Sequence, residues 1–411
     1  MSAEIAHDRI LNGLLKGFGG AVLPEEFESR LSKSIEIVVP PMRATELWPA
    51  IWALASILER QSRGLVFVNA GIAQAPFAPS PLGPRVKFID RATPSDFKIA
   101  VATGTAGHPA STVVADAAAG RIAVGGLLSP ASKPSPVECF ALAGYLGFRA
   151  LAALAGIPSY REDFASGILE IPVDAMALAE SLQASPGYTC VGLGQVGQAM
   201  LALLYFLYHG DFGRRRLNLI DPDIFVSENQ RTQILLAEQQ PWLNAAKATY
   251  MEGLCRSWNA KALGESEAIT WGWKRGSRPS IGLVGPHDFE TRRMACAAKF
   301  DAMIECGVGT NFLQPRVSWH VLRGDAERWR GLFADREARS PEVAEANWVR
   351  ALKASPGACG WVQFLGISAT APCLGVAAAA LAMAQFSQSV SGGGTAGLWS
   401  QLLPLQRFAL T

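Results

Sequence analysis

Three glycines, Gly192, Gly194 and Gly197, stand in the stretch TCVGLGQVG, after an apolar run and before a long apolar segment. Glycine at this spacing permits a tight turn from a strand into a helix, and it lets a phosphate approach the amides at the helix N-terminus. We therefore expect these glycines to bind the phosphates of a nucleotide. The spacing serves NAD and a nucleoside triphosphate equally, and it also fits a tight turn without any ligand.

A second polar group follows the next predicted strand, in the stretch IDPDIFVSENQRTQ. Asp221 ends that strand, where an acid can hold the ribose hydroxyls. Further polar side chains follow it, namely Asp223, Asn229, Arg231, Gln233 and Lys247. A dehydrogenase does not need this cluster. In a triphosphate site, arginine and lysine neutralise charge on the phosphates, and amide side chains add neutral hydrogen bonds. The cluster favours ATP over NAD.

A carboxylate also follows the predicted strand SIGLVG, in the stretch GPHDFETRR. The carboxyl ends of parallel strands meet at one edge of a sheet, so Asp288 is expected near the glycines. Magnesium prefers oxygen ligands and is commonly bound by one or two carboxylates together with phosphates. We therefore predict Asp288 as the metal-associated residue of a magnesium ATP site.

This ordered set resembles the ubiquitin-activating-enzyme superfamily, including the ThiF-type adenylyltransferases of sulfur-carrier proteins, over about residues 186 to 390. The resemblance implies adenylation of a carboxylate. It also implies a phosphate loop at the glycines, a ribose ligand at Asp221, and a magnesium-associated Asp288 with Arg292 beside it. Asn229, Gln233 and Lys247 would handle the triphosphate. One departure concerns Arg231, which comes one residue earlier than in the family and whose role therefore stays open.

A cysteine completes the expected chemistry if the acyl group is captured as a thioester. Cys359 is flanked by glycine in ASPGACGWVQFLG and is similar in placement to the catalytic cysteine of compact ubiquitin-like activators. Cys306 and Cys373 are the fallback candidates. The implied partners are a ubiquitin-like protein, whose C-terminal glycine is activated, and a ubiquitin-conjugating-like enzyme. Sulfur-carrier adenylation and a non-catalytic or NAD-binding Rossmann protein remain alternatives, and a homodimer stays open.

The elements that position these residues predict an α/β fold. A strand at YTCVGL, a helix at AMLALLYFLYHG and a strand at RRRLNLID make one βαβ unit, and SIGLVG, AMIECG and RVSWHVL continue the sheet. The first half, with strands at SIEIVVP, GLVFVNAGI, RVKFID, FKIAVATG and GRIAVGGLL, has no phosphate loop. We predict a Rossmann-like, doubly wound adenylation domain preceded by a degenerate, inactive adenylation-like domain, which could contribute Arg9 or Arg43 to the triphosphate.

The expected boundaries are a helical segment at 1–35, an inactive domain at 36–157, a linker at 158–185, an active domain at 186–390 and a tail at 391–411. Within the active domain, a crossover segment is expected at about 323–360.

Composition excludes several other classes of protein. The 411 residues are 49% hydrophobic and carry a net charge of +2, which does not suggest a nucleic-acid-binding surface. The charged N-terminal residues do not form a secretory signal, so a cytoplasmic protein is expected. Two long apolar segments, around residues 138–156 and 373–386, are expected as buried helices too interrupted or too short to cross a membrane. The seven cysteines contain no C-x-x-C pair, which argues against structural zinc.

Overall fold

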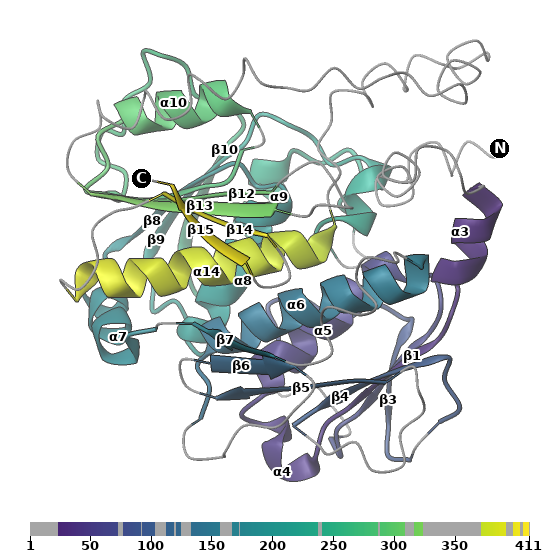
Figure 1. The fold of residues 1–411 in the computed structure, drawn as a ribbon. Helices are drawn as coiled ribbons and strands as arrows, with labels where there is room; N and C mark the ends of the chain where they lie inside the picture. The colour runs from purple at the N-terminus through teal and green to yellow at the C-terminus, as the bar shows by residue number, and fades with distance from the viewer. Residues whose placement is uncertain are drawn as a thin grey trace.

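The computed structural model describes residues 24–72, 77–91, 93–102, 112–118, 121–124, 133–156, 167–171, 173–236, 241–286, 288–308, 316–323, 371–391, 398–402 and 406–410. Across these residues the strands form two sheets, one in each half of the chain (Figure 1). The expected α/β, Rossmann-like fold class is confirmed.

The first sheet has the order β3-β2-β1-β4-β5-β6-β7. Its first five strands are parallel, and β6 and β7 are antiparallel additions at one edge. Its strands are β1 Ile35–Val38, β2 Val66–Asn69, β3 Val86–Ile89, β4 Phe97–Val101, β5 Thr112–Ala118, β6 Arg121–Val124 and β7 Gly167–Glu170.

The second sheet has the order β10-β9-β8-β11-β12-β13-β14-β15. Strands β10, β9, β8, β11 and β12 pair in parallel. Strands β13, β14 and β15 continue the sheet with antiparallel pairing. Its strands are β8 Gly187–Val191, β9 Arg216–Ile220, β10 Lys261–Glu265, β11 Ile281–Val284, β12 Ala302–Val308, β13 Arg316–Arg323, β14 Leu398–Leu402 and β15 Gln406–Leu410.

The two sheets repeat one strand order, with β1 corresponding to β8. In the first sheet β1 lies between β2 and β4, and in the second sheet β8 lies between β9 and β11. The strand order therefore reverses beside β1 and beside β8. Ligands of open α/β sheets bind outside the carboxyl ends of the strands at such a switch point. In the first half this position reads Val39-Pro40-Pro41 instead of glycines. Proline has no backbone N–H, so Pro40 and Pro41 offer no amide donor to a phosphate there.

Four helices fill the space between the sheets. Helices α5 and α6 cover one face of the first sheet, and α8 and α14 cover the facing side of the second (Figure 1). Buried apolar side chains from both halves form one continuous core, in which Trp52 and Phe140 contact Phe206. The helices are α3 Pro24–Leu31, α4 Pro41–Ala44, α5 Trp48–Gln61, α6 Pro136–Ala155, α7 Ala175–Ala184, α8 Gln195–Leu207, the 3₁₀-helix η2 Ser227–Arg231, α9 Lys247–Ser257, α10 Phe289–Ala297 and α14 Pro372–Val390.

The two long apolar segments are the crossing helices α6 and α14. Helix α6 begins at a capping box of Ser135 and Glu138, and it ends where Gly156 adopts a left-handed conformation. The backbones approach closely, because a Cβ added to Gly144 would lie 2.7 Å from the backbone nitrogen of Ala377. By length and composition both helices could cross a membrane, so the expectation that they are too interrupted or too short is corrected. Most of each helix is nevertheless buried inside the protein. Their expected burial is confirmed.

Two expected boundaries differ from the structure. The range 158–185, expected as a linker, contains α7 and also β7, which pairs with β6 at the edge of the first sheet. The range 391–411, expected as a tail, contains β14 and β15, and β14 pairs with β13. Of these strands, β7 and β15 each form one edge of a sheet. The crossover segment, apart from residue 323, and the first 23 residues lie outside the described residues.

Candidate functional site

The glycine turn lies at the switch point of the second sheet, between the ends of β9 and β11. Gly192 has a φ of +83°, and its N–H donates to the carbonyl of Ile220 at 2.9 Å. On its other side, a Cβ added to Gly192 would lie 2.8 Å from the backbone nitrogen of Pro286. Both the left-handed conformation and the close approach require glycine. The glycine turn therefore packs closely against the carboxyl ends of β9 and β11.

The other two glycines of the turn have opposite surroundings. A Cβ added to Gly197 would lie 2.0 Å from the carbonyl oxygen of Gly192, so this position is closed by the turn itself. A Cβ added to Gly194, the N-cap of α8, would meet no described atom within 4 Å. The space beside Gly194 adjoins the helix N-terminus, where backbone N–H groups attract an anion. Gly194 is thus the glycine beside which a phosphate has room.

This contrast predicts different effects of alanine at the two positions. Gly197→Ala is expected to destabilise the protein by about 1–3 kcal/mol, because the overlap outweighs the gain of about 1 kcal/mol in helix propensity. Gly194→Ala is expected to leave the free energy of unfolding nearly unchanged but to weaken ATP binding about tenfold, because the methyl group occupies the space beside the amides. Urea unfolding and calorimetric titration with ATP separate the two effects. Equal ATP affinity in Gly194→Ala and the wild type would contradict the phosphate assignment.

A cluster of two acids and one lysine lies beside the turn. The Oδ2 atom of Asp221 accepts from the N–H of Leu193 at 2.6 Å, and Lys247 Nζ lies 2.7 Å from Asp223 Oδ2 and 3.9 Å from Asp221 Oδ1. Burial raises the pKa of Asp221, and Lys247 with the N–H groups of Leu193 and Asp223 opposes that rise. Lys247 begins α9 and is 7% exposed. Lys247, which the sequence predicts as a triphosphate-binding residue, therefore lies beside the glycine turn.

The amide side chains of Asn229 and Gln233 form hydrogen bonds within the protein. Asn229 accepts through Oδ1 from the N–H of Val226 at 2.9 Å, which closes the turn at η2. Gln233 accepts through Oε1 from Gln198, and both residues are buried. Arg231 ends η2. The predicted roles of these residues in binding a triphosphate stay predictions.

Asp288 and Arg292 lie at the turn after β11 but face different partners. Asp288 caps α10, with its Oδ1 accepting from the N–H of Thr291 at 2.6 Å. Arg292 donates to the carbonyl of Pro286 at 2.9 and 2.8 Å and pairs with Glu305 at 2.7 Å. Arg292 therefore fixes the backbone that packs on Gly192 and is not directed at a metal.

Sequence reasoning missed four residues of this region. Glu305 on β12 also pairs with His320 on β13, its register partner. Charged residues inside the apolar strands AMIECG and RVSWHVL were the signal that could have found this pair. The other two are Gln198 and Arg60, a polar residue inside α8 and an arginine of the first half. Their positions give no local signal in the sequence.

Six cysteines lie in the described part of the chain, and all of them are buried. Burial raises the pKa of Cys373 to about 12 and also raises the pKa of Cys306 well above its usual value, and the nearby Glu305 adds to the rise at Cys306. The thiolate is the nucleophile, so neither fallback candidate is suited to accept an acyl group. Cys359 lies outside the described residues, as does Arg9.

Arg43 is bound within the first half. Its contacts in the structure are Glu46, Asp116 and the carbonyl of Ala117. The expectation that it reaches across to the triphosphate is therefore not met by this geometry.

No group of three metal-ligating side chains occurs among the residues that the structure describes. A magnesium ion held by Asp288 would take further ligands from water and from the phosphates of the nucleotide. Such a mixed set is usual for magnesium. The carboxylate of Asp288 therefore fits a magnesium ion that is bound together with the phosphates of a nucleotide.

Comparison with known proteins gives one family. A family model described as the BilD C-terminal domain matches residues 187–393. This range covers half of the chain and includes β8 to β13, α14 and the whole candidate site. No curated protein matches the sequence.

Three solved structures are similar to the chain at low identity. MccB of E. coli with MccA-N7isoASN is 11% identical, with 64% of this chain and 70% of that chain covered and a TM-score of 0.37. MccB of E. coli with ATP is 11% identical, with 64% and 71% covered and a TM-score of 0.36. Selenomethionine PaaA is 14% identical, with 64% and 71% covered and a TM-score of 0.34.

Proposed function

This chain belongs to the BilD C-terminal domain family, and we propose from that premise that its second half is an ATP-dependent adenylating domain of the ThiF type. The observation that carries the proposal is the open space beside Gly194 at the switch point, next to a lysine held between two acids. The N-terminus of α8 favours an anion there, and Lys247 supplies a positive charge that offsets the charge of the two acids beside it. A triphosphate makes use of both, whereas the dinucleotide NAD has no need of the lysine.

In this proposal the acyl substrate is the C-terminal glycine of a ubiquitin-like protein. An oxygen of its carboxylate attacks the α-phosphorus of ATP, the bond between the α-phosphorus and the bridging oxygen breaks, and pyrophosphate leaves. Lys247 stabilises the charge that develops on the phosphates, and the amides after Gly192 hold them in place. The resulting acyl adenylate carries AMP as a good leaving group.

Magnesium, when bound, neutralises part of the triphosphate charge. Asp288 is the residue that would hold it, because it lies at the turn next to Pro286, and Pro286 packs on the glycine turn. The carboxylate has two oxygens, and capping α10 uses one of them.

The second step in this proposal is capture of the acyl group by a cysteine. The thiolate of Cys359 attacks the acyl carbon, the bond to AMP breaks, and a thioester forms that a conjugating-like enzyme then accepts. The support for this choice is that the six cysteines in the described part of the chain are buried. In this proposal the reaction takes place in the cytoplasm.

We expect magnesium ATP to bind and NAD not to bind, because Lys247 lies where a triphosphate needs a cation. Isothermal titration calorimetry with each nucleotide, in the presence of magnesium, tests this expectation. Lys247→Met is the matched variant and should lower ATP affinity about tenfold or more, the usual scale for a lost charge-assisted contact. Tighter binding of NAD than of ATP would reject the adenylation proposal.

A further inference from the structure

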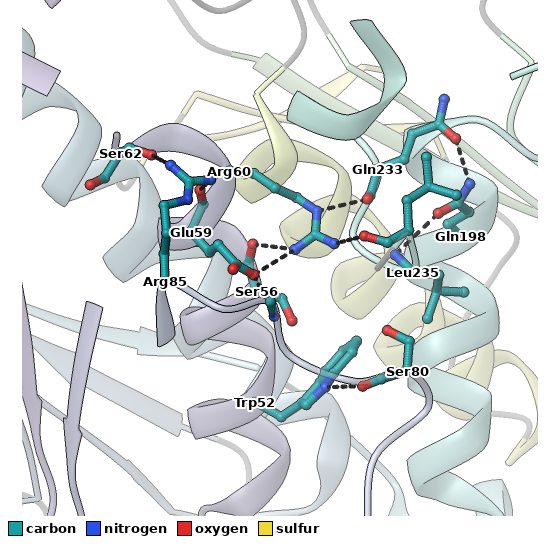
Figure 2. A network of polar contacts seen from close by, with 12 residues as sticks. Trp52, Ser56, Glu59, Arg60, Ser62, Ser80, Arg85, Gln198, Gln233 and Leu235 are labelled. Atoms are coloured by element: carbon teal, nitrogen blue, oxygen red, sulfur yellow. Dashed lines mark hydrogen bonds and ion pairs between the residues drawn. The ribbon is translucent and has the colours of Figure 1, made fainter. Parts of the chain in front are cut away.

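An arginine of the first half reaches the backbone of the candidate site. Arg60, near the end of α5, is 5% exposed, and it donates from Nε to the carbonyl of Gln233 and from Nη1 to the carbonyl of Ser56, both at 2.8 Å (Figure 2). Its Nη2 donates to the carbonyl of Leu236. The planar guanidinium presents several donors in fixed directions, so it can hold carbonyls of both halves at once.

The hydrogen bonds continue from there to the glycine turn. The Gln233 side chain accepts from Gln198 on α8, as Figure 2 shows, and the same Gln198 amide donates to the carbonyl of Leu193 at 3.1 Å. The Gln198 oxygen accepts from the N–H of Leu235 at 3.1 Å. Leu193 in turn donates to Asp221. A continuous set of buried contacts thus joins α5 to the turn between Gly192 and Gly194.

We propose that Arg60 is a positioning residue for the nucleotide site: the half without a phosphate loop sets the geometry of the glycine turn in the other half by holding the segment 233–236. The proposal rests on the proposed function, because it assumes that the turn binds a nucleotide. Its physical reason is that a buried carbonyl must have a donor. Without Arg60, the carbonyl of Leu236 loses the donor that the guanidinium supplies, and the carbonyl of Gln233 keeps only the N–H of Leu236 at 3.4 Å. The segment then shifts, and Gln198 no longer holds the carbonyl of Leu193 in one place.

The same region offers a matched control. Arg85 also donates to two carbonyls, those of Ser62 at 3.0 Å and of Glu59 (Figure 2). Both carbonyls belong to the first half. A change at Arg85 therefore removes a comparable pair of hydrogen bonds without touching the segment 233–236.

The experiment compares Arg60→Met, Arg60→Lys and Arg85→Met in the full chain. Amide hydrogen exchange is followed in peptides covering 192–198 and 229–236, with peptides of α14 as the reference for global unfolding. The affinity for magnesium ATP is measured by calorimetry. For Arg60→Met we expect about tenfold faster exchange in the two site peptides, unchanged exchange in α14, and about tenfold weaker ATP binding. Arg60→Lys should recover part of both effects, and Arg85→Met should change neither.

A double-mutant cycle tests the route through Gln198. If Arg60 acts through that side chain, the loss of ATP affinity in Arg60→Met with Gln198→Leu should be smaller than the product of the two single losses. The proposal is overturned if exchange rises equally in α14, if Arg85→Met matches Arg60→Met, or if the two losses multiply. If the wild type binds no ATP, the proposed function fails, whereas the exchange of the site peptides still decides whether Arg60 orders the turn.

Discussion

Replacing Asp288 with asparagine is expected to lower ATP–pyrophosphate exchange, driven by the ubiquitin-like partner, by about 10²–10³-fold. The free energy of unfolding should stay within about 0.5 kcal/mol of the wild type, because asparagine caps a helix as well as aspartate does. The amide oxygen can still accept from the N–H of Thr291. What the variant loses is the negative charge that magnesium requires. Exchange assays and urea unfolding of the same preparation measure the two quantities.

Two further variants separate capping from metal binding at this helix. Asp288→Ala removes both functions and should lose exchange and about 1 kcal/mol of stability. Glu290→Gln removes a charge from the first turn of the same helix, where Glu290 contacts Trp271 and Arg293, and should keep full exchange. Calorimetry adds a direct readout, because magnesium should raise the ATP affinity of the wild type but not of Asp288→Asn. Full exchange in a folded Asp288→Asn protein would remove Asp288 from the site.

Replacing Cys359 with alanine is expected to abolish the thioester adduct while leaving pyrophosphate exchange at the wild-type level. Adenylation uses no thiol, whereas thioester formation has no substitute for its nucleophile. The structure strengthens the choice, because the six cysteines that it describes are buried and the sequence contains seven. A nonreducing gel, with and without reductant, detects the adduct.

The matched control for this variant is Cys373→Ala, which removes a buried thiol next to Gly147. It should keep the adduct, with some loss of stability from the small cavity. An adduct that persists in Cys359→Ala and disappears in Cys373→Ala would move the acceptor to α14 and require that helix to open. If the wild type forms no adduct but does exchange pyrophosphate, sulfur-carrier adenylation becomes the better assignment.

Sequence patterns predicted most of the parallel strands, because these strands are apolar and lie next to clear turns. The β-strand segments SIEIVVP, YTCVGL and SIGLVG all form central strands. Five strands escaped prediction, two of them, β5 and β10, among the parallel ones. In β10, with the sequence KALGE, only Ala262 is buried, and β7, β14 and β15 depend on pairing with distant partners. Their structure is decided by neighbours and not by local preference.

For the candidate site, the order of residues along the chain predicted which side chains lie near one another. It did not predict their hydrogen-bond and ion-pair partners. Asp221, Asp223 and Lys247 do lie together, because the loop after β9 folds back and the N–H of Lys247 donates to the carbonyl of Asp223 at 2.9 Å. Arg292 could not be assigned from its spacing, since its partner Glu305 lies on another strand. The same limit applies to Arg60, whose carbonyl partners are in the other half.

The crossing of α6 and α14 also has a consequence for how the chain reaches its native state. Helix α6 ends at Ala155, and the helix that covers it begins at Pro372. Contacts between such distant segments form slowly, because a long loop must close before the contact is made. During synthesis α6 emerges well before its partner, and the part of its apolar surface that α14 covers stays exposed until α14 has left the ribosome. A chain shortened before Pro372 should therefore aggregate or recruit chaperones, even though both parallel sheets could already have paired.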